Sequence, residues 1–410
     1  MERLELARLL SAQAPAGGRS VAGGAAPVVV DESDPVRFMR AFGAAAAGRA
    51  PVFLADPSWG VAERAALDLL LRLKPGATGE GGWLMIPSGG TGGKLKFARH
   101  DQDTLLEAVM GFRSHFCADR INCIGVLPLH HVSGLMAWVR ASLTGGTYQP
   151  WDWKLLEAGE RPVLSPGGRW FLSLVPTQLQ RLLASETATE WLMGFHAIMV
   201  GGGPVWPALA QAAACARLPL SPCYGMTETA AMVAALRPDE FLAGARGCGS
   251  ALPHARISLS PEGVVRVSGA SIFRGYYPEQ DARMAGREFE TGDLGAIDQC
   301  GHLRIFGRRD GIIITGGRKV DPAEVEASLW STGEFSDVAV LGVPDAEWGE
   351  AVVAFYPSDQ KEPDLLRVAE ICRDLAGFKR PRRYQPVPKW PRNAQGKVNR
   401  TALLAAIRVD

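Results

Sequence analysis

The chain has 410 residues, of which 47% are hydrophobic, and its 44 basic and 43 acidic residues leave a formal net charge of +1. This length can hold two or three domains with a sizeable core, and the balanced charge gives no electrostatic argument for nucleic acid or an anionic membrane as partner. No segment offers the about 18 consecutive apolar residues of a membrane-spanning helix, and the charges of Glu2, Arg3, Glu5 and Arg8 interrupt any N-terminal signal segment. The seven cysteines are scattered without a Cys-x-x-Cys pair, which favours reduced thiols and a cytoplasmic location.

Helical and strand patterns alternate through the first half of the chain. We expect an amphipathic helix over residues 1–11 and a second helix over Asp101–Phe116. Short apolar runs predict buried strands at Val28–Val30, Val52–Leu54, Ile121–Leu127, Phe171–Val175 and Ala197–Val200. This alternation indicates an α/β fold.

The pattern changes in the second half. From Gly247 to Phe306, short strand patterns separated by Gly and Pro predict a β-rich subdomain. A domain boundary is expected near Arg308–Asp310. Beyond it, Ile312–Thr315 predicts a strand, and Asp321 followed by Pro322 predicts the capped start of a helix. The last hundred or so residues therefore read as a small α/β module.

A loop rich in hydrogen-bond donors follows the apolar run Trp83–Ile86. Between Ser88 and Lys96 the sequence places four glycines, two hydroxyl side chains and two lysines within nine residues. Glycines let backbone N–H groups converge on one point, and hydroxyl and ammonium groups add donors for a polyphosphate. It is not a Walker A loop, because Leu95 stands where that motif needs Ser or Thr after its lysine. Taken alone, such a loop is also typical of a surface turn.

Further motifs follow this loop in a fixed order. They are Leu127–Gly134, Tyr224–Glu228, Thr291–Asp293, Gly307–Asp310 running into Gly316–Lys319, and Pro391–Arg400. With these motifs, residues 80–400 resemble the adenylate-forming enzymes: acyl-CoA synthetases, firefly luciferase and peptide-synthetase adenylation domains. The resemblance implies an N-terminal domain over residues 1–307, with mixed sheets flanked by helices and the β-rich subdomain at about 247–306. It further implies a hinge at 308–310 and a small mobile α/β lid over 311–410.

The resemblance also implies a phosphate site. Ser88, Thr91 and Lys96 match positions that hold the β- and γ-phosphates of ATP, with Gly90 in the same loop. Thr227 matches a contact to the α-phosphate, and Glu228 matches a ligand of Mg²⁺, the hard cation that a carboxylate beside a triphosphate calls for.

The loop departs from the commoner family pattern at Gly89, Gly92 and Leu95, where Ser, Thr and Pro are more usual. We expect these changes to loosen it, so that it is disordered without nucleotide. Only 87 residues precede the loop, fewer than in most relatives, so we also expect a reduced N-terminal subdomain.

An adenosine site is implied by the next motifs. Tyr224 and Gly225 fall where the family stacks an aromatic ring on adenine, and Asp293 falls where a carboxylate accepts hydrogen bonds from the ribose, with Arg308 as a second partner. Alone, Tyr224 is also typical of a packed tyrosine before a turn, and Asp293 of a turn residue. A glycine-rich turn would let the backbone approach the base closely; it consists of Gly201, Gly202, Gly203 and Pro204.

The C-terminal motifs imply a lid that moves between two half-reactions. Lys397 matches the lysine that reaches the carboxylate and the α-phosphate during adenylation, whereas a lysine in such a loop is otherwise typical of solvated surface. Asp310 matches the hinge about which the lid turns. Gly316, Gly317 and Lys319 would line the tunnel for the thiol.

The short length and the segments Pro128–Gly134 and Lys96–His100 are most similar to the o-succinylbenzoate–CoA ligases of the compact cyanobacterial kind. Such an enzyme uses ATP, Mg²⁺ and coenzyme A on the route to phylloquinone or menaquinone. Its substrate has two carboxylates, and the one that does not react needs a charged or hydroxyl partner. His131 occupies the family's motif position beside the acyl channel, and His130 replaces a more usual aromatic residue. The candidates for holding the second carboxylate are His130, His131, Ser133, Arg140 and Thr229.

Other functions remain open at this stage. The chain could be a CoA ligase for another aryl acid or a fatty acid, or a catalytically dead nucleotide-binding sensor. A carrier-loading adenylation domain is less favoured because no carrier domain follows. An oxidoreductase is not favoured either, because this sequence has no Gly-x-Gly-x-x-Gly motif at the start of a βαβ unit. An isolated histidine pair is more often structural than catalytic, and the sequence shows no third ligand at metal-binding spacing. We expect small-molecule partners, no nucleic acid, no stable membrane insertion, and a monomer or homodimer.

Overall fold

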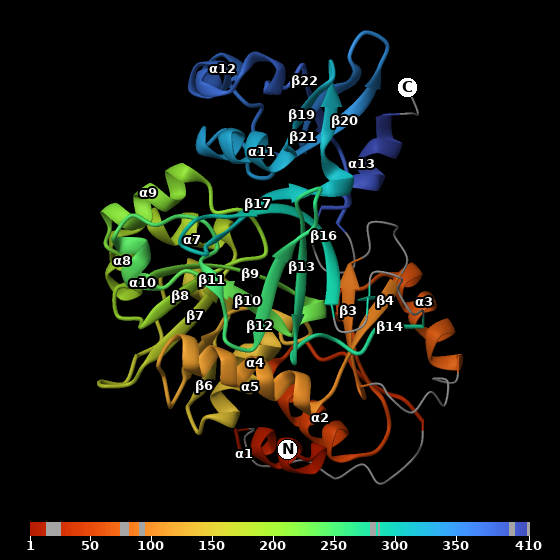
Figure 1. Ribbon diagram of the computed structural model, residues 1–410, viewed down its shortest axis with the longest axis vertical. Helices are drawn as coiled ribbons and strands as arrows, with labels where there is room; N and C mark the ends of the chain where they lie inside the picture. Colours follow the sequence, from red (N-terminus) through yellow and green to blue (C-terminus); the bar gives the residue numbers. More distant parts are fainter. Residues whose placement is uncertain are drawn as a thin grey trace.

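The computed structural model describes residues 1–13, 26–73, 82–89, 95–278, 284–285, 288–392 and 398–407. Figure 1 shows the N-terminal helix at one end of the long axis and the C-terminal module at the other. The predicted α/β character is confirmed, because sheets and helices alternate in layers through most of the molecule.

The first sheet has the strand order β1-β2-β3-β4-β14. Its strands are β1 (Val28–Val30), β2 (Val52–Leu54), β3 (Leu84–Gly89), β4 (Leu95–His100) and β14 (Tyr276–Tyr277). The first three are parallel, whereas β3 and β4 pair antiparallel, with Ser88 opposite Lys96. The predicted strands at 28–30 and 52–54 are therefore confirmed.

The second sheet has the order β11-β10-β9-β8-β7-β5-β6. Its strands are β5 (Asn122–Gly125), β6 (Tyr148–Pro150), β7 (Trp170–Leu174), β8 (Ala197–Val200), β9 (Leu220–Met226), β10 (Ala231–Ala235) and β11 (Ser250–Ala251). Strands β5 to β9 are parallel. Of these, β5, β7 and β8 are buried almost throughout, which explains their apolar runs. The predicted strand at 197–200 is confirmed, whereas β5 is shorter than the predicted 121–127.

Helices cover both faces of these two sheets. They are α1 (Arg3–Gln13), α2 (Pro35–Ala47), α3 (Val61–Arg72), α4 (Gln102–His115), α5 (Val132–Leu143), α6 (Trp153–Glu157), α7 (Pro176–Leu183), α8 (Glu186–Leu192), α9 (Pro207–Cys215) and α10 (Pro238–Leu242). Side chains from α1, α2, α4 and α5 form one core between the two sheets. Side chains from α6 to α10 cover the far face of the second sheet, and those of α3 cover the far face of the first.

Strand alternation assigns side chains to these cores. In β8, Ala197 and Met199 enter the core between the sheets, whereas Ile198 and Val200 enter the core on the far face. This is the two-residue period of a strand. The predicted helix at 101–116 is also confirmed, because the Asp101 side chain accepts hydrogen bonds from the first turn of α4.

The third sheet is antiparallel, with the order β12-β13-β16-β15 and β17 paired to β16. Its strands are β12 (Ala255–Leu259), β13 (Val264–Gly269), β15 (Met284–Ala285), β16 (Glu288–Ile297) and β17 (Leu303–Arg308). The predicted β-rich segment 247–306 is therefore rich in strands, but β11 pairs with the second sheet and β14 with the first. A local sequence pattern identifies strands without identifying the sheet that they join.

The C-terminal module is a fourth sheet with helices on both faces. Its strands are β18 (Ile313–Thr315), β19 (Arg318–Val320), β20 (Ala339–Asp345), β21 (Gly349–Pro357) and β22 (Arg383–Val387), and its helices are α11 (Pro322–Ser331), α12 (Leu365–Ile371) and α13 (Arg400–Ile407). The predicted cap of α11 is confirmed, since the Asp321 side chain accepts a hydrogen bond from the Ala323 N–H at 2.9 Å. Trp330 of α11 packs against Trp206 with the rings tilted by 32° and their centroids 5.5 Å apart, and this contact joins the module to the larger part.

Four short 3₁₀ turns complete the described structure: η1 (Thr227–Thr229), η2 (Arg309–Gly311), η3 (Cys372–Asp374) and η4 (Gly377–Lys379). Among the described residues, no helix combines the length and the apolar composition that crossing a membrane requires.

Candidate active site

Glu228 is the centre of a buried hydrogen-bonded cluster. It lies in η1, is 6% exposed, and its Oε1 accepts hydrogen bonds from the Ser88 hydroxyl and the Tyr276 hydroxyl, each at 2.5 Å. These donors come from the end of β3 and from β14, so the first sheet orients a carboxylate that the second sheet carries. Such charge-assisted bonds are short and hold the carboxylate in one orientation.

Lys96 adds positive charge beside this cluster. It faces Ser88 across the β3–β4 pair, and its Nζ lies 3.7 Å from the centroid of the Tyr276 ring. Two further residues predicted to bind phosphate, Gly90 and Thr91, lie outside the described residues. The expected disorder of this loop without nucleotide therefore stays a prediction.

The turn that carries Glu228 needs an unusual backbone. Ala230 and Ala231 have φ of 52° and 76°, in the left-handed region that non-glycine residues rarely adopt. The Thr229 hydroxyl donates to the Ala231 carbonyl oxygen at 2.5 Å, and a Cβ on Gly225 would lie 1.9 Å from that same oxygen. Thr229 is fully buried and its hydroxyl serves this turn, so we do not keep it among the residues proposed to contact the acid.

His100 supports the same turn from β4. Its Nε2 lies 2.7 Å from the Thr227 carbonyl oxygen, and its Nδ1 lies 3.0 Å from the Thr104 hydroxyl. Because complete burial lowers the pKa of His100 to about 4, the imidazole is neutral at pH 7. Because a carbonyl oxygen can only accept a hydrogen bond, the proton is on Nε2, which donates a hydrogen bond to the Thr227 carbonyl oxygen.

A second polar cluster joins β9, β16 and β17. The Tyr224 hydroxyl donates to Asp293 Oδ2 at 2.6 Å, and Arg308 Nη1 lies 3.4 Å from Asp293 Oδ1. Burial, followed by the charge of Asp293, raises the pKa of Tyr224 well above its usual value, so the phenol stays protonated. The structure therefore brings together Tyr224, Asp293 and Arg308, three of the residues that the resemblance assigns to adenine and ribose.

The glycine-rich turn Gly201–Pro204 follows β8 directly. A Cβ on Gly201 would lie 2.9 Å from the sulfur of Cys223, and Gly202 has a φ of +75°. Residues 202–204 are exposed, at the end of a strand that neighbours β9. The turn therefore lies at the same edge of the second sheet as Tyr224.

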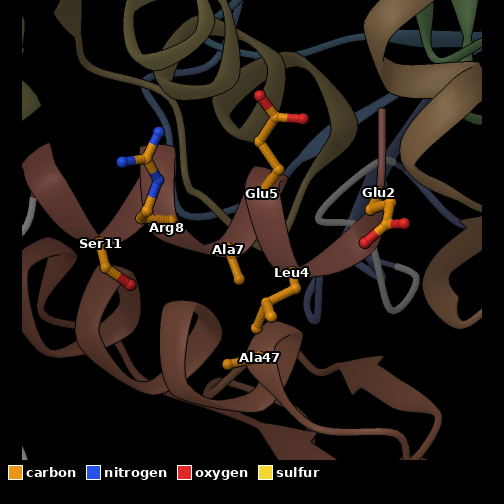
Figure 2. Close-up of a pocket in the computed structure, with 7 residues that line it drawn as sticks. All are labelled: Glu2, Leu4, Glu5, Ala7, Arg8, Ser11 and Ala47. Carbon is orange, nitrogen blue, oxygen red and sulfur yellow. The ribbon is translucent and has the colours of Figure 1, made fainter.

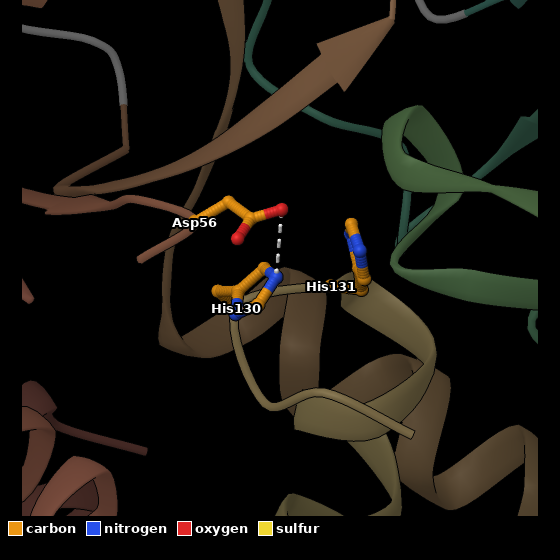
Figure 3. A group of neighbouring side chains, drawn as sticks. All are labelled: Asp56, His130 and His131. Carbon is orange, nitrogen blue, oxygen red and sulfur yellow. Dashed lines mark ion pairs between the residues drawn. The ribbon is translucent and has the colours of Figure 1, made fainter. Parts of the chain in front are cut away.

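The histidine pair lies at the N-terminal end of α5, where His131 is the residue that precedes the first turn. His130 is buried and its Nε2 lies 3.4 Å from Asp56 Oδ2, whereas His131 and Ser133 are half-exposed. Figure 3 shows Asp56 and the two imidazoles converging from two separate loops. The sequence did not place Asp56 in this group.

Arg140 lies two turns further along α5. It is 3% exposed, its guanidinium lies 4.2 Å from the centroid of the Phe112 ring, and no described carboxylate pairs with it. Burial lowers the pKa of Arg140 to about 10, so it stays charged at pH 7. A buried cation without an anionic partner is costly unless a ligand supplies the anion.

The C-terminal residues of the predicted site lie in the other module. Asp310 is in η2, directly after β17, and Gly316 and Gly317 form the turn between β18 and β19 with φ of +54° and +74°. Lys319 is exposed on β19. Lys397 lies outside the described residues.

A surface groove of about 430 Å³ lies elsewhere, between α1 and the end of α2. Figure 2 shows Glu5 and Arg8 of α1 and Ala47 of α2 among the residues that line it. None of the predicted site residues contributes to it.

Three residues that take part in these clusters were not predicted from the sequence: Tyr276, His100 and Asp56. His100 ends a segment that carries the family resemblance, and Tyr276 stands in a tyrosine pair after a glycine, but neither pattern indicates a contact with the Glu228 turn. Their roles depend on the pairing of β14 with β4 and of β4 with β3.

The chain matches two family models. Residues 45–277 match the AMP-binding enzyme model, and residues 324–397 match the AMP-binding enzyme C-terminal domain. The first match contains Ser88, Tyr224, Glu228 and Tyr276.

Curated relatives include several 2-succinylbenzoate–CoA ligases. The Bacillus licheniformis ligase is 31% identical over 343 residues, which cover 78% of this chain and 69% of the relative. The Geobacillus kaustophilus ligase is 33% identical over 297 residues, which cover 68% of this chain and 60% of the relative. The Enterococcus faecalis ligase is 32% identical over 285 residues, which cover 66% of this chain and 58% of the relative. The chain thus spans 58–69% of the length of these relatives.

Solved structures share the fold. The o-succinylbenzoate CoA synthetase of Bacillus subtilis, in complex with its acyl-adenylate intermediate, has a TM-score of 0.75 at 22% identity and covers 98% of this chain and 91% of its own. The ATP-bound MatB protein of Rhodopseudomonas palustris has a TM-score of 0.73 at 22% identity, over 99% and 92% of the two chains. From these matches, the chain belongs to the AMP-binding enzyme family, the adenylate-forming enzymes.

Proposed function

We propose that this protein is an ATP-dependent acid–thiol ligase that activates 2-succinylbenzoate and transfers it to coenzyme A, for phylloquinone or menaquinone synthesis. The observation that carries the proposal is the buried Glu228 cluster beside the Tyr224–Asp293 pair, in a chain whose relatives are 2-succinylbenzoate–CoA ligases. In the first step a carboxylate oxygen of the acid attacks the α-phosphorus of ATP, and pyrophosphate leaves. In the second step the sulfur of coenzyme A attacks the acyl carbon, and AMP leaves.

The residues around Glu228 suit the first step. Both hydrogen bonds that described side chains donate to the Glu228 carboxylate go to Oε1. We therefore assign Oε2 to Mg²⁺, a cation that prefers oxygen ligands. Bound there, Mg²⁺ would supply positive charge to the phosphates. Lys96, Ser88, Gly90 and Thr91 would hold the β- and γ-phosphates, because the reacting groups are all anions and their repulsion must be offset.

The adenosine would occupy the second cluster. Tyr224 and Gly225, with Gly201–Pro204, would contact the adenine, and Asp293 with Arg308 would bind the ribose hydroxyls. The bond from Tyr224 to Asp293 fixes the ring and the carboxylate relative to each other. Thr227 would contact the α-phosphate, and the neutral His100 would hold that turn in place.

The C-terminal module would act as a lid. We infer that residues 1–307 form the N-terminal domain, that the hinge is 308–310 with Asp310 at its centre, and that 311–410 is the lid. Lys397 would stabilise the charge at the α-phosphorus during adenylation. Gly316, Gly317 and Lys319 would then line the path of the thiol after the lid has turned.

The second carboxylate of the acid would bind Arg140. This guanidinium is buried without a described carboxylate partner, and an Arg–carboxylate pair in a buried site is a strong, oriented interaction. His130, His131 and Ser133, at the other end of the same helical region, are the further contacts that we propose for the acid.

The test of the function measures pyrophosphate release and CoA-thioester formation with ATP, Mg²⁺ and a panel of acids. We expect turnover with 2-succinylbenzoate and not with simple benzoates or fatty acids, and we expect Lys397→Ala to abolish adenylation. Turnover with another acid alone would keep the reaction and overturn the substrate. No turnover with any acid would instead support a dead nucleotide-binding scaffold.

The test of the carboxylate contact compares two acids. We expect Arg140→Met to lower kcat/KM for 2-succinylbenzoate roughly tenfold or more. It should leave kcat/KM unchanged for 4-oxo-4-phenylbutanoate, which lacks the second carboxylate. An equal loss with both acids would show that Arg140 serves folding and would exclude it as the contact.

Small molecules would be the only partners of this reaction, and we propose a cytoplasmic monomer or homodimer. All seven cysteines are free thiols in the structure, as a reducing compartment would keep them. Sedimentation of the purified protein at several concentrations would measure the oligomeric state, and fractionation of the native cells would measure the location.

A further inference from the structure

Asp56, His130 and His131 bring three ligand atoms together outside the nucleotide site. One ligand atom from each residue lies within 4.8 Å of the other two. Asp56 follows β2 of the first sheet, and the histidines precede α5. In Figure 3 the carboxylate of Asp56 points toward the two imidazoles. The sequence separates these residues too widely for a metal-binding motif, and the fold alone assembles them.

The distance between Asp56 and His130 fits a shared metal ion better than a direct hydrogen bond. Nε2 of His130 lies 3.4 Å from Oδ2 of Asp56, beyond the about 2.7–3.2 Å of an N–H···O bond, and this buried nitrogen donates to no described acceptor. Zinc–nitrogen and zinc–oxygen bonds of about 2.1 Å at a tetrahedral angle place the two ligand atoms about 3.4 Å apart. The pair therefore has the spacing of one edge of a zinc tetrahedron.

The ligands are already oriented by their neighbours. Oδ1 of Asp56 accepts hydrogen bonds from the Ser58 N–H at 2.8 Å and the Ser58 hydroxyl at 2.7 Å, which leaves Oδ2 turned toward His130. A hydrogen-bonded second layer of this kind is what fixes metal-ligating carboxylates in proteins.

The loop that carries the histidines is held just as firmly. The His131 N–H donates to the Pro128 carbonyl oxygen at 3.1 Å, and a Cβ on Gly134 would lie 2.2 Å from that oxygen, so only glycine allows this close approach. Asp56 and His130 are each 8% exposed, whereas His131 is half-exposed. The His131 ring turns about a χ2 torsion with broad, roughly two-fold preferences, so the position of its ring nitrogens is adjustable.

We propose that Asp56, His130 and His131 bind one Zn²⁺ ion, with a fourth coordination position open on the side of His131. Two imidazoles and one carboxylate with an open position are a ligand set of zinc sites, whereas Mg²⁺ prefers six oxygen ligands. This site is separate from the oxygen ligand that Glu228 provides. It uses His130 and His131, which we also propose as contacts of the acid, so a bound Zn²⁺ would lie between these two side chains and the acid.

The experiment uses the full chain, purified without a metal-affinity tag and stripped with a chelator. Zn²⁺ and Co²⁺ are titrated against a chromophoric competitor, and bound metal is counted by mass spectrometry. We expect one Zn²⁺ per chain, and a Co²⁺ complex with d–d bands in the visible and no thiolate charge-transfer band. His130→Gln and Asp56→Asn should each lose this binding, and Ser58→Ala should weaken it about 10–100-fold, as second-layer changes do.

The matched control is His302→Gln. His302 also faces a carboxylate, with its Nε2 3.7 Å from Glu240 Oε1, but no third metal ligand joins that pair among the described residues. Zinc binding should be unchanged in this variant. Circular dichroism of each metal-free variant separates loss of the site from loss of folding, and His131→Gln, at a half-exposed position, provides a ligand deletion that spares the core.

Three results would overturn the proposal. One is the absence of stoichiometric binding to the folded wild type, which would leave Asp56 and His130 as a buried ion pair. Another is binding that survives in folded His130→Gln and His131→Gln proteins. The third is a Co²⁺–thiolate band, which would place the metal on the cysteines.

Discussion

At the scale of single residues, one oxygen of Glu228 organises the candidate site. Oε1 accepts from both Ser88 and Tyr276, which come from different strands of the first sheet. Hydrogen bonds to a charged group contribute about 1.5–3 kcal/mol each. The Tyr276 ring also lies beside the ammonium group of Lys96. One side chain therefore positions both the Glu228 carboxylate and the Lys96 ammonium group of the phosphate site.

Tyr276→Phe removes only the hydroxyl that donates to Glu228. Because a charge-assisted bond is lost, we expect kcat/KM for Mg·ATP to fall roughly tenfold or more, with a higher Mg²⁺ requirement. The adjacent Tyr277 offers a control, since its hydroxyl donates to the carbonyl oxygens of Leu70 and Leu73 and not to the site. Tyr277→Phe should lower stability and leave kcat/KM unchanged. An equal kinetic effect of the two substitutions would argue against a positioning role for Tyr276.

At the scale of elements, the site depends on the turn that joins β9 to β10. The strands pair antiparallel across it, with Gly225 opposite Met232. The left-handed residues Ala230 and Ala231 bring the Ala231 carbonyl oxygen so close to residue 225 that no side chain fits there. The close approach of these two strands therefore fixes the turn that presents Thr227 and Glu228.

Gly225→Ala places a methyl group 1.9 Å from a backbone oxygen that cannot move without breaking the turn. We expect the free energy of unfolding to fall by more than about 2 kcal/mol, with loss of adenylation. Urea unfolding measures the change. Gly377→Ala is the control, because a Cβ at that position would meet no atom within 4 Å and its φ is ordinary. Stability of Gly225→Ala within about 0.5 kcal/mol of wild type would contradict the crowding that the turn requires.

At the scale of the whole molecule, the layered packing buries basic groups as well as apolar ones. His115 is 4% exposed at the end of α4, within the layer of helices between the two large sheets. Burial, followed by the charge of Arg237, lowers the pKa of His115 to about 4, and burial lowers that of His100 likewise. Both imidazoles are therefore neutral in the folded protein down to mildly acidic pH.

The sign of the pH dependence follows from these lowered pKa values. In the unfolded chain a histidine has a pKa of about 6.5. Below that pH the unfolded chain binds protons that the buried histidines of the folded chain do not bind, so stability is lost as the pH falls toward 4. We expect the free energy of urea unfolding to drop between pH 7 and pH 5, by roughly 2 kcal/mol for each fully buried histidine. His115→Gln should show a smaller drop than wild type. The same drop in wild type and His115→Gln would exclude His115 as a source.

The sequence alone predicts the elements whose signals are local. Strand β8 has the bounds that its apolar run predicts, and α11 begins at the predicted Asp321 cap, because both depend on neighbouring residues alone. It also determined the family, since the order of short motifs is a property of the chain. The pairing of Tyr224 with Asp293 and Arg308 agrees with the predicted grouping, although their roles stay proposals.

Contacts between residues far apart in the chain could not be predicted without the three-dimensional packing. Tyr276 reaches Glu228 because β14 pairs with β4, which no local pattern predicts. Asp56 meets His130 because the first sheet packs against the helices of the second. The sequence does not distinguish Thr229 from other candidate hydroxyl side chains, but in the structure its hydroxyl donates to the Ala231 carbonyl oxygen within its own turn. Local propensity depends on a few adjacent residues, whereas these contacts depend on strand pairing and layer packing between segments far apart in the chain.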